Sequence, residues 1–125
     1  MVKIIVYGLD NLAAIDASKE MQKSLLKLLN IEENELDFIA VASSFLNNGI
    51  EQNSYKGLVN ILIPDVFVNQ KKEILDTVEN VLKTYLIQFD IIFRFYSKDN
   101  LFTHFNEDYP KNINSTSLFE LMFFG

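Results

Sequence analysis

The sequence contains no cysteine and no tryptophan, and it has one histidine, one arginine, two prolines and four glycines. Without cysteine the chain forms no disulfide, has no thiol nucleophile and offers no thiolate to a metal ion. The histidine, His104, has no second histidine or cysteine near it, which makes a metal site improbable. We therefore expect neither a metal nor a cofactor.

Excess basic charge and long apolar runs are also missing. The formal net charge of -6 argues against nucleic acid and against anionic membrane surfaces, since both attract basic patches. No apolar run approaches the roughly 18 residues of a membrane span, and the first residues do not resemble a signal peptide. We expect a cytoplasmic protein whose partners include neither nucleic acid nor membrane.

What the sequence does contain is enough apolar material for one core. Hydrophobic residues make up 49% of the 125 residues and charged residues 22%, which is typical of a globular chain. We expect a single domain over residues 1–125. Within it, residues 1–42 and 58–96 form two similar units, and residues 97–125 form a hairpin and an apolar tail expected to dock on a neighbouring subunit.

The first unit reads as strand, helix and strand. Residues 2–8 are apolar and β-branched, which predicts a strand. Apolar residues at spacings of three and four then predict an amphipathic helix over residues 12–29, ending at Asn30. Residues 36–42 predict a second strand. On the helix, a row of lysines suggests a solvated face, with an anion site as the weaker alternative: Lys19, Lys23 and Lys27.

The second unit repeats this order. Between the units, residues 43–57 carry a turn signal at Asn47-Asn48-Gly49 and predict a short helix or an interface loop. Residues 58–63 predict a strand that Pro64 stops. Asn69 suits the N-cap of a second helix, and residues 89–96 predict the last strand.

The order β-α-β, β-α-β predicts an α+β fold with a four-stranded mixed sheet and both helices on one face. The second face of the sheet should then meet water and alternate cleanly with polar residues. Instead it carries too much apolar surface to leave exposed, and no third helix is available to cover it: Ile5, Tyr7, Leu58, Leu62, Ile92 and Tyr96. A partner subunit should cover this face.

This pattern resembles the tautomerase superfamily, which includes macrophage migration inhibitory factor, and above all its branch of uncharacterised bacterial tautomerase-like proteins. The resemblance rests on element order over residues 2–109, on the strand that runs into the short acidic turn at residues 6–10, and on the aromatic residues 102–106 after the last strand. The alternative is a ferredoxin-like sandwich, which has the same element order.

The resemblance implies a homotrimer whose three sheets enclose a central barrel. In the family's enzymes an amino-terminal proline is the general base for keto–enol transfer, because a terminal amine titrates near neutrality. Here Val2 stands at that position. The family's substrate-anchoring arginines near the first helix are missing too, since this region reads Asn11-Leu12-Ala13.

Four further residues are candidates for binding a small anionic ligand. Arg94 could clamp a carboxylate, although pairing with a carboxylate across a subunit interface is the favoured alternative. Lys3 could bind an anion or be an exposed strand-end lysine. Tyr7 and Tyr96 could line a pocket or pack in an interface.

Two functions remain open at this stage. One is a non-catalytic or ligand-binding trimer that has lost its base. The other is a small-molecule tautomerase that uses its amino-terminal amine at a pocket between subunits.

Overall fold

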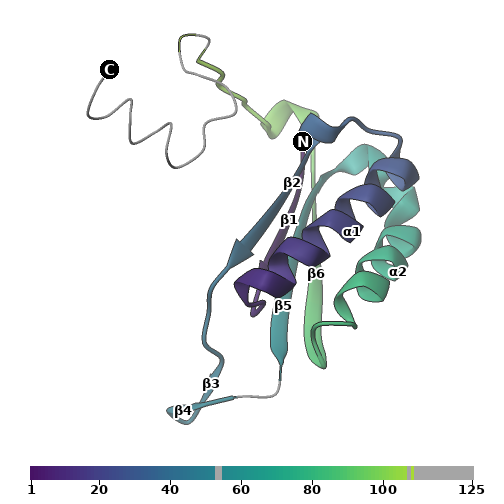
Figure 1. Cartoon of the computed structure of the whole chain (residues 1–125). Helices are drawn as coiled ribbons and strands as arrows, with labels where there is room; N and C mark the ends of the chain where they lie inside the picture. The colour runs from purple at the N-terminus through teal and green to yellow at the C-terminus, as the bar shows by residue number, and fades with distance from the viewer. Residues whose placement is uncertain (53–54, 107, 109–125) are drawn as a thin grey trace.

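A computed structural model describes residues 1–52, 55–106 and 108 of the chain. Its body is a four-stranded sheet with two helices packed side by side on one face (Figure 1). The sheet strands are β1 (Val2–Tyr7), β2 (Leu36–Val41), β5 (Lys56–Pro64) and β6 (Gln88–Tyr96), and the helices are α1 (Asn11–Leu29) and α2 (Lys71–Leu82). Neither helix, in the part of the chain described, is long and apolar enough to cross a membrane.

The strand order decides between the two expected folds. The order is β2-β1-β5-β6, with β1 parallel to β2, β5 parallel to β6, and the two pairs joined by antiparallel β1 and β5. In a ferredoxin-like fold, the two strands of each β-α-β unit are separated by a strand from the other unit. Here the two strands of each unit pair directly, so the tautomerase-like α+β arrangement is confirmed and the ferredoxin-like alternative is wrong.

Helix α1 begins and ends where its sequence favours it. The Asp10 side chain is the N-cap and accepts a hydrogen bond from the Ala13 backbone N–H at 2.8 Å. Asn30 ends the helix in the left-handed conformation, with φ of 53°. The stripe that this helix buries against the sheet is Ala14, Ala17, Met21, Leu25 and Leu29.

Helix α2 begins later than the sequence suggested. After Pro64 the chain first forms a 3-10 helix, η2 (Asp65–Gln70), so Asn69 lies inside this turn and the expectation of an Asn69 N-cap is wrong. Gln70 occupies the N-cap position without capping through its side chain. Its side-chain amide instead donates to the Leu28 carbonyl at 3.2 Å, near the end of α1. The two helices are therefore tied together where one ends and the other begins.

The segment between the units contains a small hairpin and, in its described residues, no helix. Its strands are β3 (Leu46–Asn47) and β4 (Ile50–Glu51), and the expected turn lies between them at Asn48 and Gly49. Both turn residues have positive φ, as a tight two-residue hairpin turn requires. In Figure 1 this hairpin projects beyond the end of the main sheet.

The two faces of the main sheet differ sharply. The helix-covered face holds side chains with no solvent exposure: Val2, Ile4, Val6, Val59, Ile61 and Ile63.

After β6 come the short 3-10 helix η3 (Lys98–Asn100) and then residues 101–106, which form no strand. The rest of the expected terminal hairpin and the apolar tail lie outside the described residues, apart from Asp108.

Candidate functional site

The register of the strands brings the start of β1 beside the ends of β5 and β6. Because β1 runs antiparallel to β5, and β6 runs parallel to β5, Lys3 pairs with Leu62 and Leu62 pairs with Arg94. These three side chains lie in one row on the open face of the sheet, away from the helices. Two cations that are 91 positions apart in the sequence thus flank one leucine.

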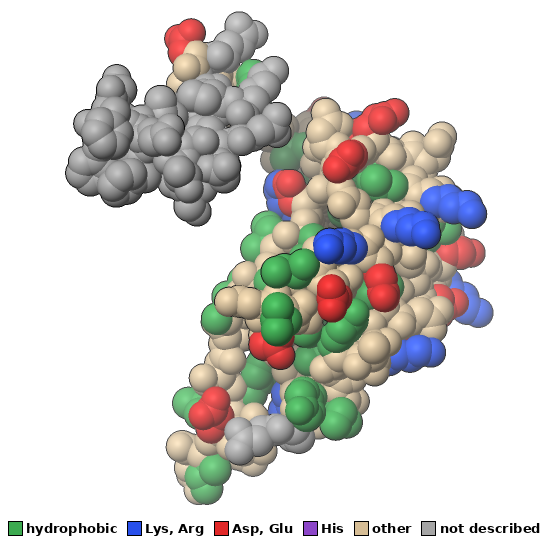
Figure 2. Space-filling view, in the orientation of Figure 1, with side chains coloured by type: hydrophobic (Ala, Val, Ile, Leu, Met, Phe, Trp, Pro, Cys, Tyr) green, Lys and Arg blue, Asp and Glu red, His purple; other side chains and the backbone are tan. Residues whose placement is uncertain are grey.

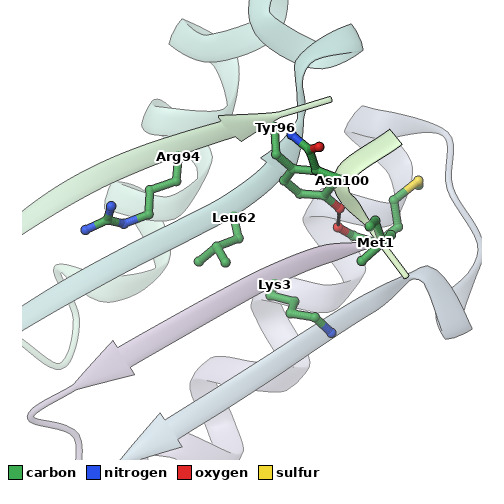
Figure 3. A pocket seen from close by; sticks show the side chains of 7 residues that line it. Met1, Lys3, Leu62, Arg94, Tyr96 and Asn100 are labelled. Carbon is green, nitrogen blue, oxygen red and sulfur yellow. Dashed lines mark hydrogen bonds between the residues drawn. The ribbon is translucent and has the colours of Figure 1, made fainter. Parts of the chain in front are cut away.

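A cavity of about 260 Å³ opens on this row. Figure 3 shows it from the open side of the sheet, with the helices behind the strands. Arg94 and the pair Met1 and Tyr96 stand on opposite sides of Leu62. The lining residues are Met1, Lys3, Leu62, Arg94, Tyr96, Asn100 and Leu101.

Tyr96 fixes one side of the cavity. Its hydroxyl donates a hydrogen bond to the Met1 carbonyl, drawn as a dashed line in Figure 3. Burial raises the pKa of Tyr96 above its ordinary value, and the nearby Lys3 ammonium opposes this by lowering it. The hydroxyl therefore stays protonated at neutral pH and remains a donor.

The two cations of the cavity are not equivalent. The Lys3 ammonium forms an ion pair with Asp37 on β2, at 2.7 Å from its carboxylate. The side chains of both partners are substantially exposed, so the pair contributes at most about 1 kcal/mol. Arg94 forms no hydrogen bond or ion pair within the described residues.

The predicted site residues are only partly brought together. Lys3, Arg94 and Tyr96 line the cavity, whereas Tyr7 lies at the far end of β1 and does not. The Val2 side chain points to the opposite face and is fully buried in the core, so Met1 lines the cavity in its place.

Besides Met1, three lining residues were not among the predicted site residues. Leu62 could have been found from its place beside Lys3 in the strand register. Asn100 and Leu101 depend on η3, which turns the chain back after β6 and is capped by the Ser97 side chain. The residues Lys98-Asp99-Asn100 are typical of a turn, so the sequence predicts a bend here but not its direction.

A second cavity, of about 560 Å³, lies between the outer sides of α1 and α2. Lysine side chains gather over this helical side of the molecule in Figure 2. Lys23 and Lys27 line the cavity, together with Glu20 and uncharged residues. Both lysines are exposed, so the geometry is that of a solvated helix face, and we assign it no ligand. Within the ranges described there is also no group of three residues suited to hold a metal ion.

Comparison with known proteins gives a fold rather than a sequence family. No protein-family model and no curated protein matches the sequence. A solved domain of unknown function from Sebaldella termitidis matches with a TM-score of 0.72 at 16% identity, over 82% of this chain and 95% of that chain.

Two further solved structures connect the fold to named proteins. A macrophage migration inhibitory factor-like protein from Entamoeba histolytica has a TM-score of 0.65 at 11% identity, over 82% of this chain and 95% of that one. A fused 4-OT symmetric trimer has a TM-score of 0.60 at 13% identity, over 80% of this chain and 88% of that one. The chain therefore has the fold of the tautomerase and macrophage migration inhibitory factor superfamily, as its element order predicted.

Proposed function

We propose that this protein is a tautomerase-like homotrimer that binds a small carboxylate-bearing molecule and does not catalyse keto–enol transfer. The observation that carries the proposal is the Arg94 guanidinium at a largely apolar cavity, where no residue that the structure describes pairs with it. A planar guanidinium donates two parallel hydrogen bonds to a carboxylate, which is the strongest recognition this side chain offers.

The cavity fits a molecule with one charged end and one apolar part. Because Asp37 already pairs with Lys3, Arg94 is the cationic side chain of the cavity without a partner among the described residues, and one guanidinium matches one carboxylate. Leu62 and Leu101 supply apolar lining, and Tyr96 and Asn100 supply polar groups. Pockets for small ligands usually combine an apolar lining with a few placed polar groups.

The residue at position 2 supports the proposed lack of catalysis. A general base must hold a lone pair near the proton it removes. Val2 lacks the secondary amine of proline, its nitrogen forms a peptide bond with Met1, and its side chain lies in the core. No arginine stands at the start of α1, where residues 11–13 are Asn-Leu-Ala, to hold a substrate in the manner of the enzymes.

The homotrimer is supported by the open face of the sheet. Ile39 is 40% exposed and Ile92 42% exposed on this face, and Ile5 lies between them. Contiguous apolar surface of this kind marks an interaction site. The 4-OT structure with the same fold is itself described as a symmetric trimer. Light scattering should give about three times the 14.5 kDa mass of one chain, and a monomer at micromolar concentration would contradict the proposal.

Titration calorimetry with phenylpyruvate and benzoate tests the ligand. We expect Arg94→Met to weaken binding roughly tenfold or more, since a hydrogen bond to a charged group contributes about 1.5–3 kcal/mol. Lys19→Met removes one exposed positive charge from α1 and should change affinity less than about twofold. Equal loss in both variants would mean that only long-range charge matters, and the Arg94 site would be wrong.

The enzymatic alternative rests on one observation, the position of Met1 at the cavity. If its removal exposed the Val2 amine there, a primary amine could act as base. We expect turnover of aryl-pyruvate enols near background in the native protein and, if the site geometry is retained, higher turnover in Val2→Pro. Circular dichroism must accompany the assay, because Val2 is a core residue. Efficient turnover by the native protein would establish the alternative.

A further inference from the structure

One strongly apolar stretch of the chain, residues 118–124, lies outside the described residues. It reads Leu-Phe-Glu-Leu-Met-Phe-Phe, and we call it the apolar tail. Large apolar side chains in such a run promote aggregation when water surrounds them. The tail therefore needs an apolar surface to cover it, and its one charged residue, Glu120, needs a cation.

The open face of the sheet offers an apolar surface together with a cation. Ile39 and Ile92 are exposed on it, and Leu62 lines its cavity beside Arg94 (Figure 3). No residue that the structure describes pairs with the Arg94 guanidinium. A segment that brings one carboxylate within apolar surroundings would match this face in both charge and polarity.

The sequence identifies the carboxylate that suits Arg94. Two carboxylate side chains lie outside the described residues, Glu107 and Glu120. Glu107 has polar neighbours on both sides, which favour water over an apolar cavity. Glu120 stands between Phe119 and Leu121, so it would carry apolar side chains to the cavity along with its charge.

Two other places with exposed apolar side chains have the wrong charge. Leu12 is exposed one helical turn before Asp16 on α1, and Ile50 is exposed next to Glu51 on the β3–β4 hairpin. The carboxylate in either place would repel the Glu120 carboxylate. Charge complementarity therefore favours the open face.

The size of the cavity and the length of the chain agree with this occupant. At about 260 Å³ the cavity lies just below the range of roughly 300–1,000 Å³ that is usual for small-molecule pockets, so it suits a side chain of the tail. Leu101 lines the cavity, so the chain passes it soon after β6. The chain between Leu101 and Glu120 spans up to roughly 60 Å when extended, which is enough for the tail to return.

We propose that the apolar tail docks on the open face of the sheet within the same trimer, with the Glu120 carboxylate on the Arg94 guanidinium. Two parallel hydrogen bonds join these groups, and the apolar side chains beside Glu120 cover Leu62. The tail then occupies the place of the small carboxylate, and a free carboxylate must displace it. This inference rests on the proposed function and adds a competitor for the same site.

Titration calorimetry of the full chain with benzoate measures the competition. Glu120→Gln removes the competing carboxylate with little change in size, and we expect benzoate to bind at least about threefold more tightly than to the native protein. Asp108→Asn removes the same charge from an exposed position and should change the affinity less than about twofold. Equal gains in both variants would reduce the effect to net charge and overturn the role of Glu120.

Limited proteolysis with chymotrypsin measures docking without any ligand. This protease cleaves after large apolar residues, which the tail contains, and docking protects them. Arg94→Glu places two carboxylates together, and we expect cleavage within residues 118–124 at least about threefold faster than in the native protein. Combining Arg94→Glu with Glu120→Arg restores opposite charges and should return the rate toward the native value. Intact-mass spectrometry locates the cuts.

The outcomes separate this inference from the proposed function. If Arg94→Met weakens benzoate binding while Glu120→Gln leaves it unchanged, and Arg94→Glu leaves tail cleavage unchanged, the ligand site stands and the docking of the tail is overturned. If cleavage depends on the Arg94 and Glu120 charges while neither the native protein nor Glu120→Gln binds benzoate, the proposed ligand is wrong and the docking stands. Circular dichroism on each variant verifies that the subunit still folds.

Discussion

The two faces of the central sheet use the same strands for different purposes. On β5, Ile61 points to the helices and is fully buried, while its neighbours Asn60 and Leu62 point to the open face and are partly exposed. On β6 the same alternation separates the partly buried Phe93 from the exposed Ile92 and Arg94. One face thus closes the core of the subunit. The other presents an apolar row together with an arginine and an amide oxygen that have no partner in the part of the chain that the structure describes.

The two faces also differ in how much side-chain burial contributes to the stability of a single subunit. Full burial of an isoleucine contributes about 1.5–3 kcal/mol, and the covered face has several such residues on its two central strands. The open face obtains that contribution only where another molecule covers it. Folding should therefore depend on the first face, and assembly and ligand binding on the second.

The largest expected effect compares two identical substitutions on opposite faces. Ile61→Ala leaves a cavity beneath the helices and should lower the free energy of unfolding of the subunit by about 2–5 kcal/mol. Ile92→Ala removes the same atoms from a side chain that is 42% exposed, so its effect on the isolated subunit should be much smaller. Urea unfolding of both variants provides the measurement.

Protein concentration separates folding from assembly in this pair. Ile92→Ala should weaken self-association, so assembly should stabilise it less and its unfolding midpoint should rise less with protein concentration than that of the native protein. If Ile92→Ala destabilises the dilute subunit as much as Ile61→Ala, the division between the two faces is wrong.

A smaller effect is expected at the turn that carries α1 onto the covered face. Gly8 has a φ of 107°, and a Cβ added there would lie 2.2 Å from the Lys56 carbonyl oxygen. Gly8→Ala must therefore shift the backbone where β1 meets β5, and we expect it to destabilise the fold by about 1–3 kcal/mol. Thermal unfolding measures this loss.

Gly49 offers the matched control. Its φ is 81°, but a Cβ there would meet nothing within 4 Å. Gly49→Ala strains only the projecting β3–β4 hairpin, so global unfolding should change little. Similar losses in both variants would mean that φ rather than the close approach to Lys56 determines the cost.

The sequence predicted the covered face better than the open site because alternation is a local signal. In residues 2–7 and 89–96 every second residue is apolar, which identified the side chains that face the core. The apolar stripe of α1 identified the helix that covers them. The prediction of an Asn69 N-cap was wrong because a 3-10 helix follows Pro64 and delays the start of α2. The capping preference of a single residue does not predict such a delay.

The candidate site depended on longer-range information. Lys3 and Arg94 were each selected as candidates, but only the antiparallel pairing of β1 with β5 places them around Leu62. That the Asn60 side-chain oxygen is buried without a hydrogen-bond partner, among the described residues, became visible only with the side chains on neighbouring strands in place.

The smallest expected effect concerns the hydrogen bond that closes the site on the open face. Tyr96→Phe removes the donor to the Met1 carbonyl and should lower the free energy of unfolding by about 0.5–1.5 kcal/mol at neutral pH. Tyr55→Phe, at a side chain that is 65% exposed, is the control and should be close to neutral.

The pH dependence of this difference tests its cause. Burial raises the pKa of Tyr96 in the folded protein, so above about pH 10 the unfolded chain loses this proton first. The stability that the neutral hydroxyl provides is present below that pH and declines as the pH rises through the raised pKa. Since Tyr96→Phe has no such proton, the gap in unfolding free energy between it and the native protein should narrow above pH 10. Tyr85, whose pKa is also raised, affects both proteins equally and cancels from the comparison. A gap that stays constant or widens would contradict a raised pKa of Tyr96 in the folded protein.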